Sequence, residues 1–484
     1  MMAAPPKLGE KTPAAIDGGI GHEDDSGSGY SSSESSSESS SERISESSSE
    51  DELLEFLGSS QPRSCIRVYG MLKRSKCGYC NVTGGSSYLG AHAYQLTCDD
   101  YQALIDRGWR RSGTFLYLTD HKDSCCAYYT IRTNALDVSL SSSDKKLLRK
   151  WRKHQATGHK GAAKNNRDIS SAPNADSLVE MVLGCSTGVV ELRLELASFS
   201  EEKFRLFAKY QRAIHKDLSS TRHGFKDFLC VSPLIPQKVS AADDSQAADA
   251  LGQDILTDRQ LGSYHQCYYI EGRLVAVGVI DILPRCVSSV YLFYDPDFSH
   301  LSLGSYSSLL EIALVRRLHR SVDLDIRHYY MGYYIPTCPK MTYKARWRPS
   351  DLLDLVTLKW IPIERCLERI REHPAFATFD PEVDQLDLVR NRIEDVLPFS
   401  PVLSLKAIQS VPGWDSADTK RLKQTMDVIE VWVLSPAPGH TNISIPTSLS
   451  LTELMEYNPH LVDFAYEIAA GLGEEMATRA IIRV

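Results

Sequence analysis

The sequence predicts a protein of mixed α and β structure (class α+β or α/β), with two folded domains behind an acidic tail. At 484 residues the chain is longer than a single hydrophobic core normally supports. Residues 1–60 contain 13 acidic and 3 basic residues, a net charge of −10, so the rest of the chain carries +2 of the total of −8. Beyond this tail, alternating apolar runs and apolar stripes at helical spacing follow one another, which is typical of a folded α and β chain.

Composition excludes several classes of protein. The chain contains no run of 18 apolar residues, so we expect no membrane span. The first residues, MMAAPPKLGEKTPAA, lack the apolar segment of a secretory signal. Without such a signal, the 12 cysteines are interpreted as thiols or metal ligands rather than disulfides. We therefore expect a cytoplasmic protein, or one that is also nuclear.

Residues 1–60 form a Ser, Glu and Gly tract with too little apolar content to build a core, and we expect it to be disordered. It is either a solubilising tail or a substrate for an acid-directed kinase.

Residues 61–140 are predicted to form a small cysteine-rich domain. Strands are expected at 66–72, 114–118 and 127–133, with a helix at 99–107. Cys77 and Cys80 form a C-x-x-C pair, and Cys125 and Cys126 follow them. Such a set can hold zinc or an iron–sulfur cluster, provided that the backbone turns at the adjacent pair. His121 is an alternative fourth ligand, and buried free thiols are the alternative to a metal site.

Residues 141–177 are interpreted as a basic helix and linker. The stretch 145–167 contains nine lysines and arginines and no acidic residue, and Trp151 continues an apolar stripe along its first half. A phosphate-binding arm or a plain solvated linker would both explain this pattern. The residues predicted to bind phosphates are Lys145, Lys146, Arg149 and Lys150.

Residues 178–395 are predicted to form a larger domain. A strand at 189–196 and a helix from Ser200 to about residue 215 are followed by a hairpin at 264–283 and a strand at 287–294. Ser302 then starts a long helix. The order of hairpin, strand, helix and strand is the one found at the centre of an N-acetyltransferase-like (GNAT-type) fold, and we predict that architecture. Residues 396–484 contain a possible strand at 428–434 and a C-terminal helix, and we assign them no role.

The most specific tract runs from residue 328 to 351, HYYMGYYIPTCPKMTYKARWRPSD. Its tyrosine pairs predict a half-buried strand, and Pro336 and Pro339 predict a turn after it. Cations alternate with aromatic residues beyond the turn, which suits an anionic, stackable ligand such as the end of a nucleic acid strand. A hydrophobic strand with a solvated basic loop is the simpler alternative.

This tract resembles the signature of arginyl-tRNA–protein transferases, which reads close to YYMGYYIHSCPKMRYKG followed by PSDLL. The chain differs from it at Pro336, Thr337, Thr342 and Ala345. The resemblance implies transfer of arginine from Arg-tRNA to the N-terminal Asp, Glu or oxidised Cys of proteins, which marks them for ubiquitin-dependent degradation. It also implies an iron–sulfur or zinc site at the cysteines, with no cofactor required for the transfer itself.

Such a reaction needs residues that recognise two charges. A carboxylate should bind the arginyl guanidinium, with Asp281 as the first candidate and Asp295 as the second. Cations should bind the acidic N-terminus, and tyrosines should stack on the terminal adenosine or donate hydrogen bonds. Cys338 is expected to be a structural thiol, since no histidine partner is evident. The proposed catalytic residues are Tyr330, Tyr334 and Asp281, and the proposed substrate-binding residues are Lys340, Tyr343, Lys344, Arg346 and Asp295.

Two other functions fit parts of the sequence. One is a coenzyme A-dependent N-acetyltransferase. However, the loop that should hold the pyrophosphate has Leu301 in place of a cation and Tyr306 in place of a small residue, so coenzyme A is not expected as a partner. The other is a non-catalytic metal- and RNA-binding sensor.

Overall fold

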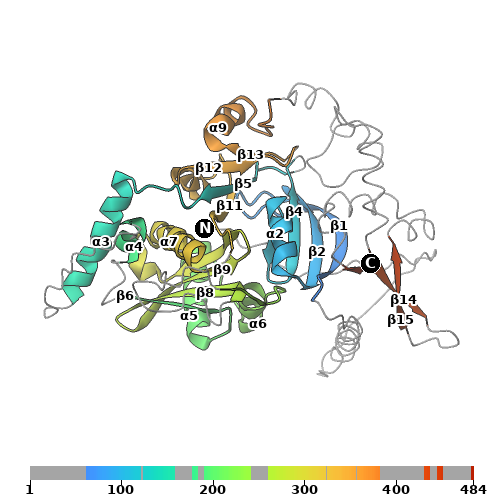
Figure 1. Cartoon of the computed structure of the whole chain (residues 1–484), viewed down its shortest axis with the longest axis horizontal. Coiled ribbons are helices and arrows are strands. Elements are labelled where there is room, and N and C mark those ends of the chain that lie inside the picture. The colour runs from blue at the N-terminus through green and yellow to red at the C-terminus, as the bar shows by residue number, and fades with distance from the viewer. Residues whose placement is uncertain are drawn as a thin grey trace, which may run out of the picture. The chain divides into compact units, whose positions relative to one another are not determined.

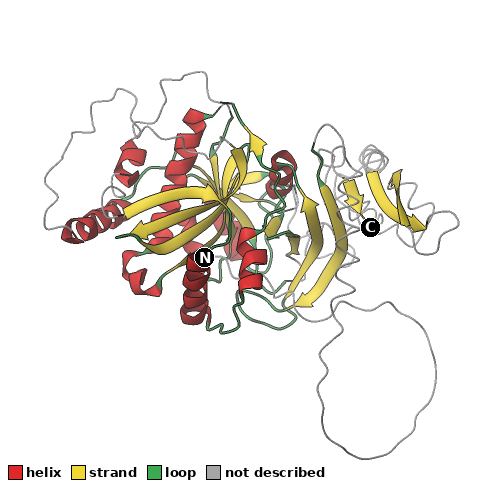
Figure 2. Cartoon of the chain, turned by 90° about the horizontal axis from the view of Figure 1, so that it is seen from below, coloured by secondary structure: helices red, strands yellow, loops and turns green. Residues whose placement is uncertain are grey.

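The computed structural model describes residues 62–121, 124–158, 177–183, 190–240, 260–322, 324–355 and 357–381, with three further strands at 430–436, 444–450 and 481–483. The described residues contain two β-sheets with helices packed on them (Figures 1 and 2). This confirms the predicted mixture of α and β structure. The acidic tail and the C-terminal helix lie outside the described residues.

The first sheet has seven strands in the order β15-β14-β16-β1-β2-β4-β3. Its centre is made by β1 (Cys65–Ser75), β2 (Ser86–Gln95) and β4 (Phe115–Asp120), with β3 (Arg110–Ser112) at one edge. The helix α2 (Cys98–Asp106) starts where the Thr97 side chain accepts a hydrogen bond from the Asp100 N–H. The strands β14 (Glu430–Pro436), β15 (Ser444–Ser450) and β16 (Ile481–Arg483) extend the sheet beyond β1.

The second sheet runs in the order β13-β12-β5-β11-β10-β9-β8-β6, with β7 paired to β8. The order of strands and helix predicted for the larger domain is present. The strands and their bounds are β5 (Tyr129–Asn134), β6 (Val190–Leu196), β7 (Gln237–Lys238), β8 (Gln260–Ile270), β9 (Arg273–Ile282), β10 (Cys286–Tyr294), β11 (His328–Tyr334), β12 (Ser350–Leu353) and β13 (Trp360–Pro362). Because β5 lies between β11 and β12, the boundary expected at residue 140 places one strand of this sheet in the first domain.

Helices cover both faces of the second sheet (Figure 2). The long helix α7 (Leu303–Ser321) packs its apolar stripe on one face. On the other face, α5 (Glu201–Tyr210), continued by the π-helical turn η2 (Gln211–His215), and α6 (Arg222–Phe225), continued by η3 (Lys226–Cys230), enclose an aromatic cluster. The other helices of the described residues are α3 (Ser142–Gly158), α4 (Ser177–Leu183), η6 (Pro296–Leu301), α8 (Pro339–Thr342), η7 (Tyr343–Arg346) and α9 (Ile363–Glu372).

The strands β10 and β11 separate partway along their length. They pair in parallel only from 286–288 to 328–330. Beyond this point β10 continues along β9 as far as Tyr294, while β11 continues along β5 as far as Tyr334. The sheet therefore opens between the two strands, next to the start of α7.

Candidate active site and cysteine cluster

A small pocket lies in the opening between β10 and β11. Its walls are Ser289–Leu292 from β10, Tyr329 and Met331 from β11, the first turns of α7, and the residues after α8. The enclosed space is about 30 Å³, on the order of one or two water molecules. The residues contributed by α7 and the loop are Gly304, Ser307, Ser308, Glu311, Tyr343 and Lys344.

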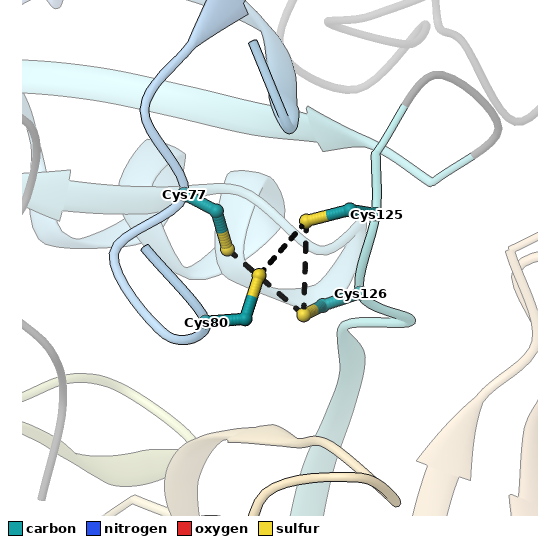
Figure 3. A group of neighbouring side chains, drawn as sticks. All are labelled: Cys77, Cys80, Cys125 and Cys126. Carbon is teal, nitrogen blue, oxygen red and sulfur yellow. Dashed lines mark hydrogen bonds between the residues drawn. The ribbon is translucent and has the colours of Figure 1, made fainter. Parts of the chain in front are cut away.

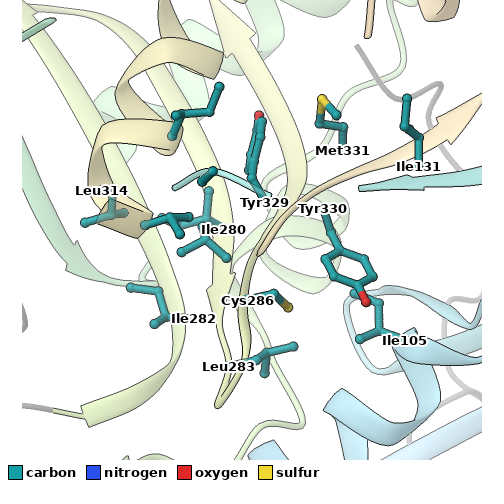
Figure 4. Packing of buried hydrophobic residues seen from close by; sticks show 14 of the residues in the cluster. Ile105, Ile131, Ile280, Ile282, Leu283, Cys286, Leu314, Tyr329, Tyr330 and Met331 are labelled. Carbon is teal, nitrogen blue, oxygen red and sulfur yellow. The ribbon is translucent and has the colours of Figure 1, made fainter. Parts of the chain in front are cut away.

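A bulge in β11 decides which tyrosines reach this pocket. The pairing with β5 shifts between Tyr330 and Tyr333, and Gly332 adopts a φ of 74°, a conformation that favours glycine. Before the bulge, Tyr329 and Tyr330 leave the strand on opposite sides, as neighbouring strand residues do (Figure 4). Past the bulge, Tyr333 shares a face with Tyr330, and the Arg110 guanidinium lies over both rings, 6.0 Å from the Tyr330 centroid and 5.4 Å from that of Tyr333.

Glu311 is the acid among the described residues that line the pocket. Its side chain is 1% exposed. The Ser307 hydroxyl donates to Oε1 at 2.7 Å, whereas Oε2 is buried and has no hydrogen-bond partner among the described residues. Burial raises the pKa of Glu311 above its ordinary value and outweighs the hydroxyl groups of Ser307, Tyr329 and Ser289, which favour the carboxylate.

Lys344 is a buried cation that also lines the pocket. Its ammonium group donates to the backbone carbonyl of Tyr333 at 2.9 Å. Burial, and secondarily the positive charge of Arg110, lowers the pKa of Lys344 to about 7. Beside it, burial raises the pKa of Tyr343 to about 12, so its phenol stays protonated as a hydrogen-bond donor. Two of the five predicted substrate-binding residues, Tyr343 and Lys344, therefore line the pocket.

The two carboxylates chosen from the sequence lie outside the pocket and already have internal partners. Asp281 is fully buried, and the Arg111 guanidinium donates to both of its oxygens, at 2.6 and 2.7 Å. The Ser263 hydroxyl adds a third donor at 2.7 Å. Asp295 pairs with Lys209 at 2.6 Å and with Arg273. Neither carboxylate lines the pocket, and each is already paired with cationic side chains of the fold.

The two tyrosines proposed as catalytic are also outside the lining. The Tyr330 hydroxyl donates to Asp106 on α2, and its ring packs edge-on against Trp360. Tyr334 is buried at the end of β11. The pocket instead uses Tyr329 and Tyr343.

The two remaining cations of the tract lie in different environments. Lys340 is exposed on α8. Arg346 forms an ion pair with Asp144 at the start of α3 and donates to the Ser305 hydroxyl at 3.2 Å. Arg346 therefore joins α3, α7 and the loop, while Lys340 faces solvent.

The basic helix α3 is anchored next to the N-terminus of α7. The Trp151 ring stacks on Tyr306 with centroids 4.0 Å apart, and its indole N–H donates to the Leu301 carbonyl at 3.0 Å. Lys150 donates to the His300 carbonyl. The predicted phosphate-binding side chains Lys145, Lys146, Arg149 and Lys150 are all exposed. The first turn of α7 is therefore packed against the Trp151 ring.

The four predicted cysteines come together as one group. Their sulfur atoms all lie within 4.8 Å of one another (Figure 3). The Cys80–Cys125 sulfur distance is 3.2 Å, and Cys126 lies 3.9 Å from both Cys77 and Cys125. Four thiolates around zinc, at about 2.3 Å each, would be about 3.8 Å apart, so the set fits a tetrahedral metal site. His121 instead accepts a hydrogen bond from the Tyr128 N–H at 3.2 Å.

Local turns allow adjacent cysteines to converge. The backbone bends from Ser124 to Cys126. This is the turn that two adjacent cysteines need if both are to face the same ion. A Cβ atom at Gly85 would lie 2.7 Å from the Cys125 sulfur, closer than real contacts allow, so glycine is required there. Burial disfavours the Cys77 thiolate, but hydrogen bonds from the Cys80 and Tyr79 backbone and from Tyr128 outweigh it and lower the pKa of Cys77 to about 7.

Comparisons with known proteins agree with this arrangement. Residues 202–354 match the family model described as "Arginine-tRNA-protein transferase, C terminus", and residues 75–146 match "Arginine-tRNA-protein transferase, N terminus". The chain is 31% identical over 435 residues to arginyl-tRNA–protein transferase 1 of Drosophila melanogaster, covering 64% of this chain and 87% of that protein. The chain belongs to the arginyl-tRNA–protein transferase family. The C-terminal match contains the pocket, and the N-terminal match contains the four cysteines.

The chain is also similar to another arginyl-tRNA–protein transferase and to a leucyltransferase. The chain is 32% identical over 337 residues to arginyl-tRNA–protein transferase 1 of Saccharomyces cerevisiae, which covers 64% of each chain. It is 28% identical over 266 residues to an aspartate/glutamate leucyltransferase of Stutzerimonas stutzeri, covering 54% of this chain and 83% of that protein. Within the described parts of this family member, no helix is long and apolar enough to cross a membrane.

Sequence reasoning missed Glu311, the buried acid of the pocket in this arginyl-tRNA–protein transferase. A signal was present, because Glu311 is four residues after Ser307 and three before Leu314 and therefore falls on the buried stripe of the predicted helix. A charged residue in such a stripe indicates either an internal partner or a ligand.

Proposed function

We propose that this chain transfers arginine from Arg-tRNA to the N-terminal Asp or Glu of proteins, or to an oxidised Cys there, and so marks them for ubiquitin-dependent degradation. The observation that carries the proposal is family membership together with a pocket, in the opening of the sheet, that contains a buried acid. The chain is accordingly an aminoacyltransferase whose partners are Arg-tRNA and protein N-termini.

The reaction makes modest chemical demands. The α-amine of the acceptor attacks the arginyl carbonyl carbon, the new amide bond forms, and the ester C–O bond breaks to release the 3′ hydroxyl of the tRNA. A peptide α-amine has a pKa of about 8, so a useful fraction is neutral near pH 7. Positioning the amine and the ester can supply about 7–11 kcal/mol of the acceleration. Transfer then requires no metal and no covalent enzyme intermediate.

The fold of the second sheet supports a GNAT-type architecture, in which the acyl donor enters between two separated parallel strands. Here the donor end would enter between β10 and β11. Trp151 on Tyr306 covers the helix turn that would hold the pyrophosphate of coenzyme A, which supports a tRNA donor rather than acetyl-CoA. The exposed cations of α3 are placed to contact tRNA phosphates next to this opening.

We assign recognition of the acidic N-terminus to Lys340. Of the three cations predicted for this role, Lys344 is buried against the Tyr333 carbonyl and Arg346 is paired with Asp144. The exposed ammonium of Lys340, in the short helix just after β11, is the one that an incoming peptide can reach.

The four cysteines are proposed to hold zinc or an iron–sulfur cluster with a structural or regulatory role. The buried cluster that contains Cys77 and Cys126 also contains Tyr333 and Met341, on β11 and α8. We further propose that an acidic tail, a cysteine-rich domain, a basic arm and a transfer domain follow one another along the chain, with the β5 strand belonging to the transfer domain. We also propose that the protein is cytoplasmic, or both cytoplasmic and nuclear.

One transfer experiment separates the candidate functions. Purified protein is given Arg-tRNA and acetyl-CoA, each labelled differently, with peptides that begin with Asp or with Ala. We expect arginine label on the Asp peptide only. Acetyl label on either peptide would support an N-acetyltransferase instead, and tRNA binding without any transfer would support a metal- and RNA-binding sensor.

A further inference from the structure

Glu311 presents an unsatisfied carboxylate oxygen to the pocket. Its Oε2 is buried without a hydrogen-bond partner among the described residues, while Oε1 accepts from Ser307. A buried polar atom left unpaired destabilises the fold, and a carboxylate more so than a neutral group. The structure therefore contains an acceptor suited to a ligand that brings both donors and positive charge.

The other groups that face Glu311 do not meet this need. The Tyr268 hydroxyl from β8 donates to Gln266 Oε1 at 2.7 Å and lies 3.1 Å from the Ser307 hydroxyl. Tyr329 from β11 and Ser289 from β10 bring hydroxyl groups near Glu311 that favour its carboxylate form, and Tyr343 from η7 is a further phenol of the lining, but none of these groups adds positive charge. Lys344 is the cation in the lining, but it donates to the Tyr333 carbonyl.

We propose that Glu311 recognises the guanidinium of the arginine esterified to the tRNA. This inference rests on the proposed function and names the residue that would set its donor specificity. A guanidinium presents paired N–H donors that match a carboxylate, and it is always charged at neutral pH. On binding, it would satisfy Oε2 and neutralise the buried acid in one step.

Entry requires a small rearrangement. About 30 Å³ is free in the pocket, less than a guanidinium with its last methylene requires. Tyr343 and Lys344 belong to the short turn η7, whereas the remaining lining comes from β10, β11 and α7. Movement of Tyr343 would therefore widen the pocket while the position of Glu311 on α7 is kept.

The test compares two donors that differ only in charge. The same tRNA is charged with arginine or with citrulline, whose ureido group is a neutral isostere of guanidinium, and single-turnover transfer to an Asp peptide is measured. We expect Glu311→Gln to lower the preference for arginine over citrulline by about 30-fold or more, which corresponds to about 2 kcal/mol. Glu311→Asp keeps the charge and should keep part of the preference.

Controls separate specificity from folding. Glu368→Gln makes the same chemical change at an exposed position of α9 and should leave the preference unchanged. Equal losses with both donors in Glu311→Gln would indicate a structural or general-base role and would overturn the inference, as would an unchanged preference. No transfer by the wild-type protein from either donor would overturn the proposed function itself.

Discussion

Lys340 offers the clearest test at the scale of single residues. Lys340→Ala should lower kcat/KM for Asp peptides about 5- to 30-fold, or about 1–2 kcal/mol, because an exposed ammonium is partly screened by water until the peptide covers it. The preference for Asp over Asn peptides should fall by the same factor, while the affinity for Arg-tRNA stays unchanged. Steady-state kinetics with the two peptides and a tRNA binding assay measure these effects.

Lys238→Ala removes a second exposed lysine, from β7, and serves as the control. If Lys340→Ala keeps the Asp-over-Asn preference but weakens tRNA binding, Lys340 contacts phosphate and acceptor recognition lies elsewhere.

Glu311 should also influence the pH dependence of stability. Burial raises its folded-state pKa above the ordinary 4.5, so the folded protein holds this proton more tightly than the unfolded chain does. As the pH rises from about 4.5 through the folded pKa, the wild-type free energy of unfolding should therefore fall relative to that of Glu311→Gln. Denaturant unfolding of both proteins from pH 4 to 8 measures the difference, which should stay flat for Glu368→Gln.

The sequence predicted side-chain chemistry better than side-chain partners. It indicated that a carboxylate and several cations were needed, and Tyr343 and Lys344 do line the pocket. The sequence could not show that Arg111 binds the Asp281 carboxylate. The two residues are 170 positions apart, and the pair forms only when β3 and β9 come together in the folded protein. Partners that distant in the chain are fixed by tertiary packing rather than by local pattern.

At the scale of elements, α3 is a basic helix held in place by one aromatic anchor. Trp151 and the Asp144–Arg346 pair fix its inner face against α7 and the loop after β11, so its outer cations stay in a defined position. The helix α3 was predicted from the sequence, but its packing against α7 was not. The contact of Trp151 with Tyr306 joins two distant parts of the chain, and a local sequence pattern does not reveal such a contact.

Neutralising the outer face should flatten the salt dependence of tRNA binding. Replacing Lys145, Lys146 and Arg149 with alanine should reduce the log–log slope by about 0.7–0.9 for each phosphate that the variant no longer binds, if values for DNA carry over. Filter binding at several salt concentrations measures the slope. The matched control replaces the exposed Lys226, Lys238 and Arg365. An unchanged slope in the α3 variant would identify α3 as a plain linker.

At the scale of the whole molecule, the cysteine group and the transfer domain share a buried core. Tyr128 donates or accepts a hydrogen bond with the Cys77 sulfur at 2.9 Å, and its ring lies 5.6 Å from that of Tyr333 on β11. A change at the cysteines can therefore be transmitted to the strand that forms one wall of the pocket.

Metal retention tests the cysteine group. Cys77→Ala should lose the bound metal, and Gly85→Ala should lose most of it, because the added methyl group would displace the Cys125 sulfur. Gly304→Ala, whose Cβ would meet nothing closer than 3.9 Å, should keep it. Elemental analysis and absorption spectra of the purified variants measure the content. Full retention in Cys77→Ala would contradict the site.

Most elements of the central sheet were predictable, because β8 to β11 and α7 follow clear periodic patterns. The arrangement of the strands in two sheets was harder to predict from the sequence. The strand β5 comes from the cysteine-rich segment, yet it pairs between β11 and β12, and the short strands β3, β12 and β13 carry too few residues for a period to be recognised.

In the proposed function, the arginyl end of the tRNA enters the opening between β10 and β11. Photocrosslinking tests it most directly, with an Arg-tRNA analogue that has a stable amide in place of the ester and a photoreactive adenosine at its 3′ end. We expect cross-links within 289–292, 329–331 or 343–346, and their disappearance in competition with unmodified Arg-tRNA. Cross-links confined to α3, or to the sheet that contains β1 and β2, would contradict the claim.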